Sequence, residues 1–202
     1  MNSRYRATRY FASAYSLDQL PPDGGREIAF TGRSNVGKSS ALNTLAWQKG
    51  LARISKTPGR TQLINFFQVA PDCYLVDLPG YGYAKVPEAM RRHWQTTIQR
   101  YLNSRQALRG LFLLMDVRHP LTALDSQMLA WCEHRGLPVH VLLTKADKLN
   151  RGAALAALRQ VQEALQPQRP RVSVQLFSAL KRTGIDAAYG KLDEWLNPSA
   201  GS

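Results

Sequence analysis

Eight consecutive residues near the start of the chain have the types and spacing of a phosphate-binding loop. Residues 32–39 fit the pattern G-x-x-x-x-G-K-[ST]. In this pattern the lysine, Lys38, reaches the β- and γ-phosphates of a nucleotide, and the hydroxyl of Ser39 ligates Mg²⁺. Gly32 and Gly37 give the backbone the freedom and close approach that a Cβ would obstruct. The pattern predicts a nucleoside triphosphate site at Gly32, Arg33, Ser34, Asn35, Val36, Gly37, Lys38 and Ser39.

The residues on either side of this loop can position it. Residues 28–31 are mostly apolar and predict a short strand, and residues 40–45 predict the first turns of a helix. A strand that runs through a glycine-rich loop into a helix points a row of backbone N–H groups at one spot. The positive end of the helix dipole lies at the same spot and favours a phosphate there.

An aspartate follows a second apolar run, residues 74–76. It begins the motif Asp77-Leu78-Pro79-Gly80. At the end of a strand, the Asp77 carboxylate is placed to hold the Mg²⁺ shell, and the N–H of Gly80 is placed to meet a γ-phosphate.

Two further motifs point to the base. Thr144-Lys145-Ala146-Asp147 follows the apolar strand predicted over 139–143. The Asp147 carboxylate only accepts hydrogen bonds, so it suits the N1–H and amine of guanine and would repel the bare N1 of adenine. Ser178 and Ala179 follow the strand predicted over 172–177, and their small size lets a backbone N–H approach the guanine O6.

These motifs, each at the carboxyl end of a predicted strand, resemble a Ras-like GTPase of the translation-factor-related class. More narrowly, the chain resembles the EngB family (also called YihA or YsxC) from about Phe11 to Leu196. The resemblance rests on the P-loop and on Lys56-Thr57-Pro58-Gly59-Arg60-Thr61 with Leu63-Ile64-Asn65-Phe66-Phe67, Asp77-Leu78-Pro79-Gly80-Tyr81-Gly82-Tyr83-Ala84 and Asp116-Val117-Arg118-His119-Pro120-Leu121-Thr122. It implies a small bacterial GTPase tied to assembly of the large ribosomal subunit and to normal septation, with that subunit or its precursor and ribosomal RNA as partners.

The resemblance also implies a set of site residues. The catalytic candidates are Lys38, Thr61, Gly80 and Asn35, and the Mg²⁺ ligands are Ser39, Thr61 and Asp77. Residues 49–61 predict a mobile first switch, ordered by Mg²⁺ and the γ-phosphate; Thr57 is the rival to Thr61 as its metal ligand. Besides the P-loop, the residues expected to bind GTP or GDP are Gly59, Arg60, Thr61, Gln62, Leu63, Asp77, Leu78, Pro79, Gly80, Thr144, Lys145, Ala146, Asp147, Phe177, Ser178 and Ala179.

The residue after the Asp77–Gly80 motif bears on the rate of hydrolysis. Ras-type enzymes have a Gln there that orients the attacking water, and here the residue is Tyr81. We therefore expect slow intrinsic hydrolysis. Asn35 is a candidate for holding K⁺ against the phosphates, as in similar GTPases that have Asn at this position. The alternative is that Asn35 is a turn residue that tolerates an unusual dihedral angle. Arg33 and Arg60 are weaker candidates for charge stabilisation than for contact with RNA or solvent.

Alternating strand and helix patterns predict an α/β fold, a three-layer P-loop domain with a mostly parallel sheet. Residues 61–69 and 73–77 are expected to pair as a hairpin that gives one antiparallel edge strand. Pro87 is expected to open a helix with an apolar face, and three later helices have candidate N-caps at Thr122 (with Asp125), Asn150 and Thr183. The apolar face of the helix that Pro87 opens is expected to consist of Met90, Trp94, Ile98, Tyr101 and Leu102. The expected organisation of the chain is a lead segment (1–25), a G domain (26–196) and a flexible tail (197–202).

The composition of the 202-residue chain fits one domain, with 44% hydrophobic residues. Its 27 Lys and Arg against 14 Asp and Glu give a net charge of +13. This excess favours a polyanionic partner, RNA first and an acidic membrane surface second; the alternative is a generally basic surface without such a partner. No apolar run is long enough to span a membrane. Cys73 and Cys132 are expected to be buried thiols of a reducing cytosol. We expect a cytoplasmic monomer, although residues 1–20 also resemble a transit peptide in composition.

Two other classes compete with a GTP switch. A metabolic P-loop kinase would have no use for Thr144-Lys145-Ala146-Asp147, so selectivity for guanine would exclude it. A non-catalytic RNA- or ribosome-binding module would retain a vestigial site, and the intact Lys38, Ser39, Thr61 and Asp77 argue against it.

Overall fold

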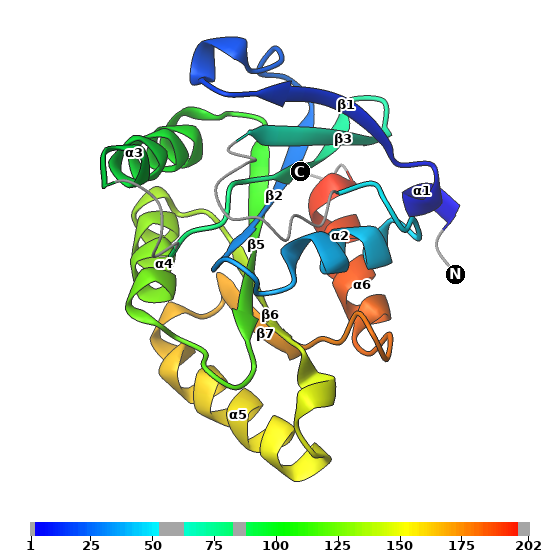
Figure 1. Cartoon of the computed structure of the whole chain (residues 1–202), viewed down its shortest axis with the longest axis vertical. Helices are drawn as coiled ribbons and strands as arrows, with labels where there is room; N and C mark the ends of the chain where they lie inside the picture. The colour runs from blue at the N-terminus through cyan, green and yellow to red at the C-terminus, as the bar shows by residue number, and fades with distance from the viewer. Residues whose placement is uncertain (1–2, 53–62, 83–87, 198–202) are drawn as a thin grey trace.

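A seven-stranded sheet with the strand order β1-β3-β4-β2-β5-β6-β7 runs through the centre of the molecule (Figure 1). The structure, a computed structural model, describes residues 3–52, 63–82 and 88–197. Its strands are β1 (Arg9–Ala14), β2 (Arg26–Gly32), β3 (Ile64–Ala70), β4 (Cys73–Asp77), β5 (Leu108–Asp116), β6 (Val139–Thr144) and β7 (Val172–Leu176). Its helices are α1 (Ser3–Arg6), α2 (Lys38–Leu45), α3 (Glu88–Ser104), α4 (Ala123–Arg135), α5 (Arg151–Ala164) and α6 (Ile185–Leu196), with short 3-10 turns η1 (Leu17–Gln19), η2 (Ala146–Lys148) and η3 (Gln166–Gln168).

The strand directions confirm the predicted fold class. Strands β4, β2, β5, β6 and β7 are parallel, and only β3 runs against its neighbours. The antiparallel hairpin of β3 and β4 was expected, but the position of β3 at the sheet edge is wrong. β1 pairs with the outer side of β3 and becomes the edge strand, so the predicted lead segment contributes a strand to the sheet.

Helices cover both faces of this sheet, as Figure 1 shows: α3, α4 and α5 on one face, α1, α2 and α6 on the other. Successive residues of a strand point to opposite faces. On β2, Ala29 therefore joins the core under α3, α4 and α5, while Ile28 and Phe30 join the core under α2 and α6. Both cores are fully closed around the parallel strands, which keeps the strand ends in fixed positions for a site.

Two of the predicted N-caps are confirmed, and one is wrong. Thr122 and Asp125 form a capping box at the start of α4, and the Asn150 side chain accepts from the N–H of Ala153 at the start of α5. Thr183 does not cap α6, because Gly184 takes that position with a φ of 78°. Thr183 instead exchanges two backbone hydrogen bonds with Ser178, each of 3.1 Å.

Other expectations about the core are also met where the structure describes them. Ile98, Tyr101 and Leu102 of α3 are buried, while Pro87 and the side chains of Met90 and Trp94 lie outside the description. Cys73 and Cys132 are buried free thiols, as expected.

A buried ion pair ties the lead segment to the sheet at the end away from the P-loop. Glu27 of β2 and Arg105, just after α3, are 1% and 5% exposed, and the Arg105 guanidinium donates to both carboxylate oxygens of Glu27. Tyr101 donates its hydroxyl to the same carboxylate at 2.7 Å. Arg105 also donates to the carbonyl oxygens of Pro21 and Pro22, so one guanidinium joins three segments of the chain.

The buried His140 of β6 makes the stability of the folded protein depend on pH. The buried ring lies 2.7 Å from the Ser173 hydroxyl and 2.8 Å from the Gln175 amide oxygen, with Lys191 and Glu194 of α6 as its charged neighbours. Burial lowers the pKa of His140 to about 4. Since the unfolded chain takes up a proton near pH 6.5 and the folded chain does not, stability should fall as the pH drops through that interval.

We expect urea unfolding to show this loss. Between about pH 7 and pH 4.5, the buried histidine should remove about 2–3 kcal/mol from the free energy of unfolding. In a His140→Gln variant, which keeps a neutral polar side chain, that part of the pH dependence should disappear. An unchanged pH profile in the variant would show that another group is responsible.

Candidate nucleotide-binding site

The predicted phosphate-binding loop connects β2 to α2, so it joins a strand end to a helix N-terminus as the sequence requires (Figure 1). A Cβ on Gly32 would lie only 2.5 Å from the carbonyl oxygen of Leu114 on the neighbouring strand, so only glycine fits there. Gly37 caps α2 with a φ of 101°, a conformation that side chains disfavour. The two glycines therefore serve different purposes, close packing at the first and a left-handed turn at the second.

Contacts from β6 hold this loop in place. The Thr144 hydroxyl donates to the carbonyl oxygen of Val36 at 2.7 Å, and the Lys145 ammonium donates to that of Asn35 at 2.8 Å. Lys145 reaches the loop from a left-handed backbone conformation, with a φ of 58°. The sequence placed both residues near a base, but this bracing of the phosphate loop was not predicted.

Asp77 lies next to Lys38, where the predicted metal and phosphate groups would meet. The Lys38 ammonium forms an ion pair with the Asp77 carboxylate, and both side chains are largely buried. Beyond Asp77, the N–H of Tyr81 donates to the carbonyl oxygen of Gly32, and the N–H of Ser34 donates to that of Tyr81. The end of β4 is therefore joined directly to the loop, which brings Leu78, Pro79 and Gly80 beside it.

The oxygen chemistry of these residues suits the predicted metal. Ser39, in the first turn of α2, offers a hydroxyl, and Asp77 offers a carboxylate; Mg²⁺ prefers such oxygen ligands and takes further ones from phosphates. Within the described ranges no cluster of three or more His, Cys, Asp or Glu side chains could hold a metal alone. The residues therefore fit a Mg²⁺ ion that arrives with a nucleotide.

The two predicted base-recognition motifs lie against each other. The Ser178 hydroxyl donates to one carboxylate oxygen of Asp147, and the N–H of Ala146 donates to the carbonyl oxygen of Phe177 at 3.2 Å. The same Ser178 hydroxyl accepts from the N–H of Lys181 at 3.0 Å. Ser178 thereby fixes the orientation of Asp147, a positioning role that the sequence did not reveal. The Phe177 side chain is buried in the core, which leaves only its backbone to face a ligand.

Asp116, at the end of β5, is a site residue that sequence reasoning used only as part of a family motif. Its carboxylate accepts from Arg118 at 2.7 Å and pairs with the Lys145 ammonium at 3.0 Å. Hydrogen bonds from Arg118, assisted by Lys145, hold the pKa of Asp116 well below its usual range. The charged carboxylate positions Lys145, and its place at a strand end is the signal that could have identified it.

The Tyr81 side chain extends to the start of α4. Its hydroxyl donates to the Asp125 carboxylate at 2.6 Å, at the capped start of α4. Burial, together with the charge of Asp125, raises the pKa of Tyr81 far above its usual value, so the phenol stays neutral. This arrangement agrees with the expectation that Tyr81 does not orient water as a glutamine would.

A hollow of about 300 Å³ borders the same loop. Its lining includes Arg33, Ser34, Asn35, Asp116, Arg118 and Lys145, but not Lys38, Asp77 or Asp147. It therefore adjoins part of the predicted nucleotide site, the loop residues and Lys145, without reaching the Lys38–Asp77 pair or Asp147. Of the other predicted site residues, Leu63 is half-buried just before β3, and Thr57, Gly59, Arg60, Thr61 and Gln62 lie outside the described residues.

The fold and the order of the motifs define a P-loop GTPase, and the family model described as "50S ribosome-binding GTPase" matches residues 27–145. A protein of Nitrosococcus oceani named "Probable GTP-binding protein EngB" is 60% identical over 97% of this chain and 98% of its own length. The chain belongs to the EngB family of GTP-binding proteins.

Solved structures agree on the fold. A crystal structure of a probable GTP-binding protein EngB has a TM-score of 0.67 at 19% identity, over 84% of this chain and 98% of that one. Era in complex with MgGDPNP and nucleotides of 16S ribosomal RNA has a TM-score of 0.66 at 20% identity, over 89% of this chain and 59% of that one. Among the described helices, none is long and apolar enough to cross a membrane.

Proposed function

We propose that this protein is a Mg²⁺-dependent GTP switch with slow intrinsic hydrolysis, which acts as a cytoplasmic monomer in assembly of the large ribosomal subunit and is needed for normal division and septation. The nucleotide-binding part of this proposal is supported by contacts among four motifs at one edge of the sheet. Lys38 forms an ion pair with Asp77, and Ser178 donates a hydrogen bond to Asp147. The description of the matching family model and the net charge of +13 support a ribosomal RNA partner.

In this proposal each residue has one task. Lys38 and the loop N–H groups bind the β- and γ-phosphates, while Ser39, Asp77 and Thr61 hold Mg²⁺. The N–H of Gly80 meets the γ-phosphate and links its presence to a second switch, the segment of residues 81–85 that follows Gly80. Asp147 selects guanine, with Ser178 holding its carboxylate, and Lys145 braces the phosphate loop at Asn35. A bound Mg²⁺ would neutralise charge on the phosphates during hydrolysis.

Tyr81 stands where Ras-type enzymes have the glutamine that orients water, so another group, partner or ion must position the water or neutralise charge during hydrolysis. Asn35 is our candidate, through a K⁺ ion held against the phosphates. Its φ of 62° also fits a plain turn residue, since asparagine tolerates the left-handed conformation. The two roles differ in whether the amide itself is needed.

Single-turnover GTP hydrolysis in K⁺ and in Na⁺ tests this proposal. We expect a rate within a few orders of magnitude of about 10⁻⁴ s⁻¹, faster in K⁺ than in Na⁺. Asn35→Gly removes the amide but suits the positive φ, and it should abolish the preference for K⁺ while GDP affinity is kept. A K⁺ effect that persists in the variant would return Asn35 to the role of a turn residue. No turnover in either salt would favour the non-catalytic module.

A further inference from the structure

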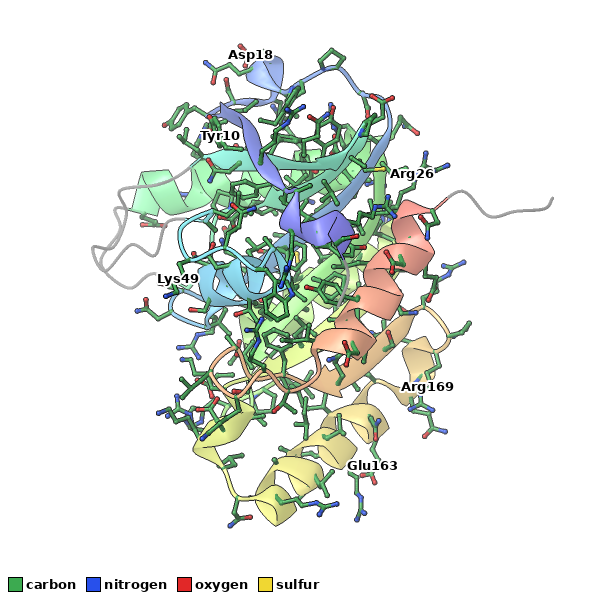
Figure 2. The ribbon with its side chains drawn as sticks, turned by 90° about the vertical axis from the view of Figure 1, so that its right-hand side faces the viewer. Tyr10, Asp18, Arg26, Lys49, Glu163 and Arg169 are labelled. Carbon is green, nitrogen blue, oxygen red and sulfur yellow. The ribbon has the colours of Figure 1, made fainter. Side chains whose placement is uncertain are left out.

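The loop that ends α2 and the loop that follows β7 meet on the side of the molecule shown in Figure 2, where α1, α2 and α6 lie. The Arg182 guanidinium lies 3.5 Å from the centre of the Trp47 indole, and the Arg6 guanidinium lies 4.8 Å from it. Gln48 joins the segment around α1 to this cluster, because its amide donates to the carbonyl oxygens of Arg6 and Thr8. Three distant chain segments therefore present positive charge around one aromatic ring.

Two residues of this cluster adopt a backbone conformation that their side chains disfavour. α2 ends in a Schellman motif, in which the N–H of Gln48 donates to Asn43 and that of Trp47 donates to Thr44. Glycine usually occupies the left-handed position of this motif, but here Trp47 does, with a φ of 57°. Arg182 also has a φ of 57°. Such conformations cost about 1–3 kcal/mol each and concentrate at functional sites, so a contact between two of them calls for a role.

The surrounding surface is strongly basic. Residues 28–71 contain no Asp or Glu, and residues 1–17 contain none either. Lys49, Lys181 and Arg182 are exposed, and within the described ranges no carboxylate forms an ion pair with any of the three. Figure 2 shows Lys49 on this side, near the end of α2. The nearest acidic residue along the chain after Arg182 is Asp186, in the first turn of α6.

We propose that Arg6, Trp47, Lys49, Lys181 and Arg182 form an RNA-binding surface. A guanidinium stacked on an aromatic ring keeps its N–H donors in a plane directed outward, a geometry that matches phosphate oxygens. RNA offers a row of phosphates together with bases that stack on arginine and aromatic groups. An anionic membrane fits less well, because the half-buried Trp47 lies between charged guanidinium groups and Leu180 is the one large hydrophobic side chain of the described 178–183 loop that is exposed.

The surface connects directly to the nucleotide site. The loop of residues 178–183 is closed by the two hydrogen bonds between Ser178 and Thr183, and Ser178 at its base holds Asp147. Lys181 and Arg182 at its tip belong to the RNA-binding surface. In the proposed function this surface would contact ribosomal RNA, and in that respect the inference rests on the proposed function. Binding of RNA to the surface can be tested without a ribosome.

The test is binding of a fluorescein-labelled RNA hairpin to the full chain loaded with GDP, over a KCl titration. The variant Lys181→Gln/Arg182→Asn removes two charges, and asparagine tolerates the left-handed backbone at position 182. The matched control, Arg151→Gln/Arg159→Gln, removes two exposed charges from α5. We expect the first variant to bind roughly tenfold more weakly, with a salt slope shallower by about 1.4–1.8, and the control to bind like the parent.

Equal weakening in both variants would overturn the proposal, because it would show that only total charge matters. Unchanged RNA binding in the first variant, or loss confined to vesicles containing phosphatidylserine, would overturn it as well. GDP affinity, measured in parallel, should be the same in all three proteins. If the variant loses RNA binding and the parent does not associate with large ribosomal subunits, the surface stands and the proposed ribosomal function fails.

Discussion

The Asp147→Asn variant should bind GDP about 30- to 1000-fold more weakly than the parent, because an amide cannot accept both N–H bonds of guanine. Loss of such a charge-assisted pair costs about 2–4 kcal/mol. The Asp147 carboxylate also accepts from the Ser178 hydroxyl, which holds it in one orientation. The measurement is a titration of the nucleotide-free protein with fluorescent GDP.

Two comparisons make this result specific. Xanthine has a carbonyl where guanine has its amine, and an asparagine amide can donate to it, so the variant should gain affinity for xanthosine diphosphate. Glu163→Gln makes the same carboxylate-to-amide change at an exposed position of α5 (Figure 2) and should leave both affinities unchanged. An Asp147→Asn protein that folds and binds GDP normally would remove Asp147 from the base site.

The Arg105→Met variant should lose about 3–5 kcal/mol of stability, because it leaves the Glu27 carboxylate buried without a counter-charge. Glu27 is 1% exposed. Among the described residues, the other side chain that donates a hydrogen bond to its carboxylate is Tyr101, whose hydroxyl is neutral. Urea unfolding of the nucleotide-free protein measures the change.

The control for this result is an exposed ion pair of α3. Arg92 and Glu88 lie 3.1 Å apart, with side chains that are 72% and 70% exposed, so Arg92→Met should change stability by less than about 1 kcal/mol. The double variant Glu27→Gln/Arg105→Met should recover part of the loss, since glutamine can still accept from Tyr101 without a buried charge. Equal costs for the buried and the exposed pair would contradict this account.

The sequence predicted the parts of this protein that depend on local patterns. Apolar runs ending in Asp77, Thr144 and Ser178 gave the strand ends, and the parallel sheet then brings those ends to one edge. Capping at Thr122 and Asn150 was predictable because it involves residues three positions apart.

What the sequence did not give depends on partners far along the chain. β1 takes the sheet edge through pairing with residues fifty or more positions away, and its exposed, irregular sequence has no strong strand pattern. Thr183 fails as a cap because Gly184 takes that position, while the backbone groups of Thr183 bond to Ser178. The bracing of the P-loop by Lys145, and of Lys145 by Asp116, follows only once β5 and β6 are neighbours.

Sedimentation with large ribosomal subunits or their precursors, at one salt concentration, tests the proposed switch most directly. Charge alone acts equally in both nucleotide states, so any difference must come from segments that respond to the γ-phosphate. We expect tight binding with a non-hydrolysable GTP analogue and weaker binding with GDP, each falling as salt rises. Identical affinities and salt curves for the two nucleotides would mean non-specific adhesion to RNA and would contradict the account.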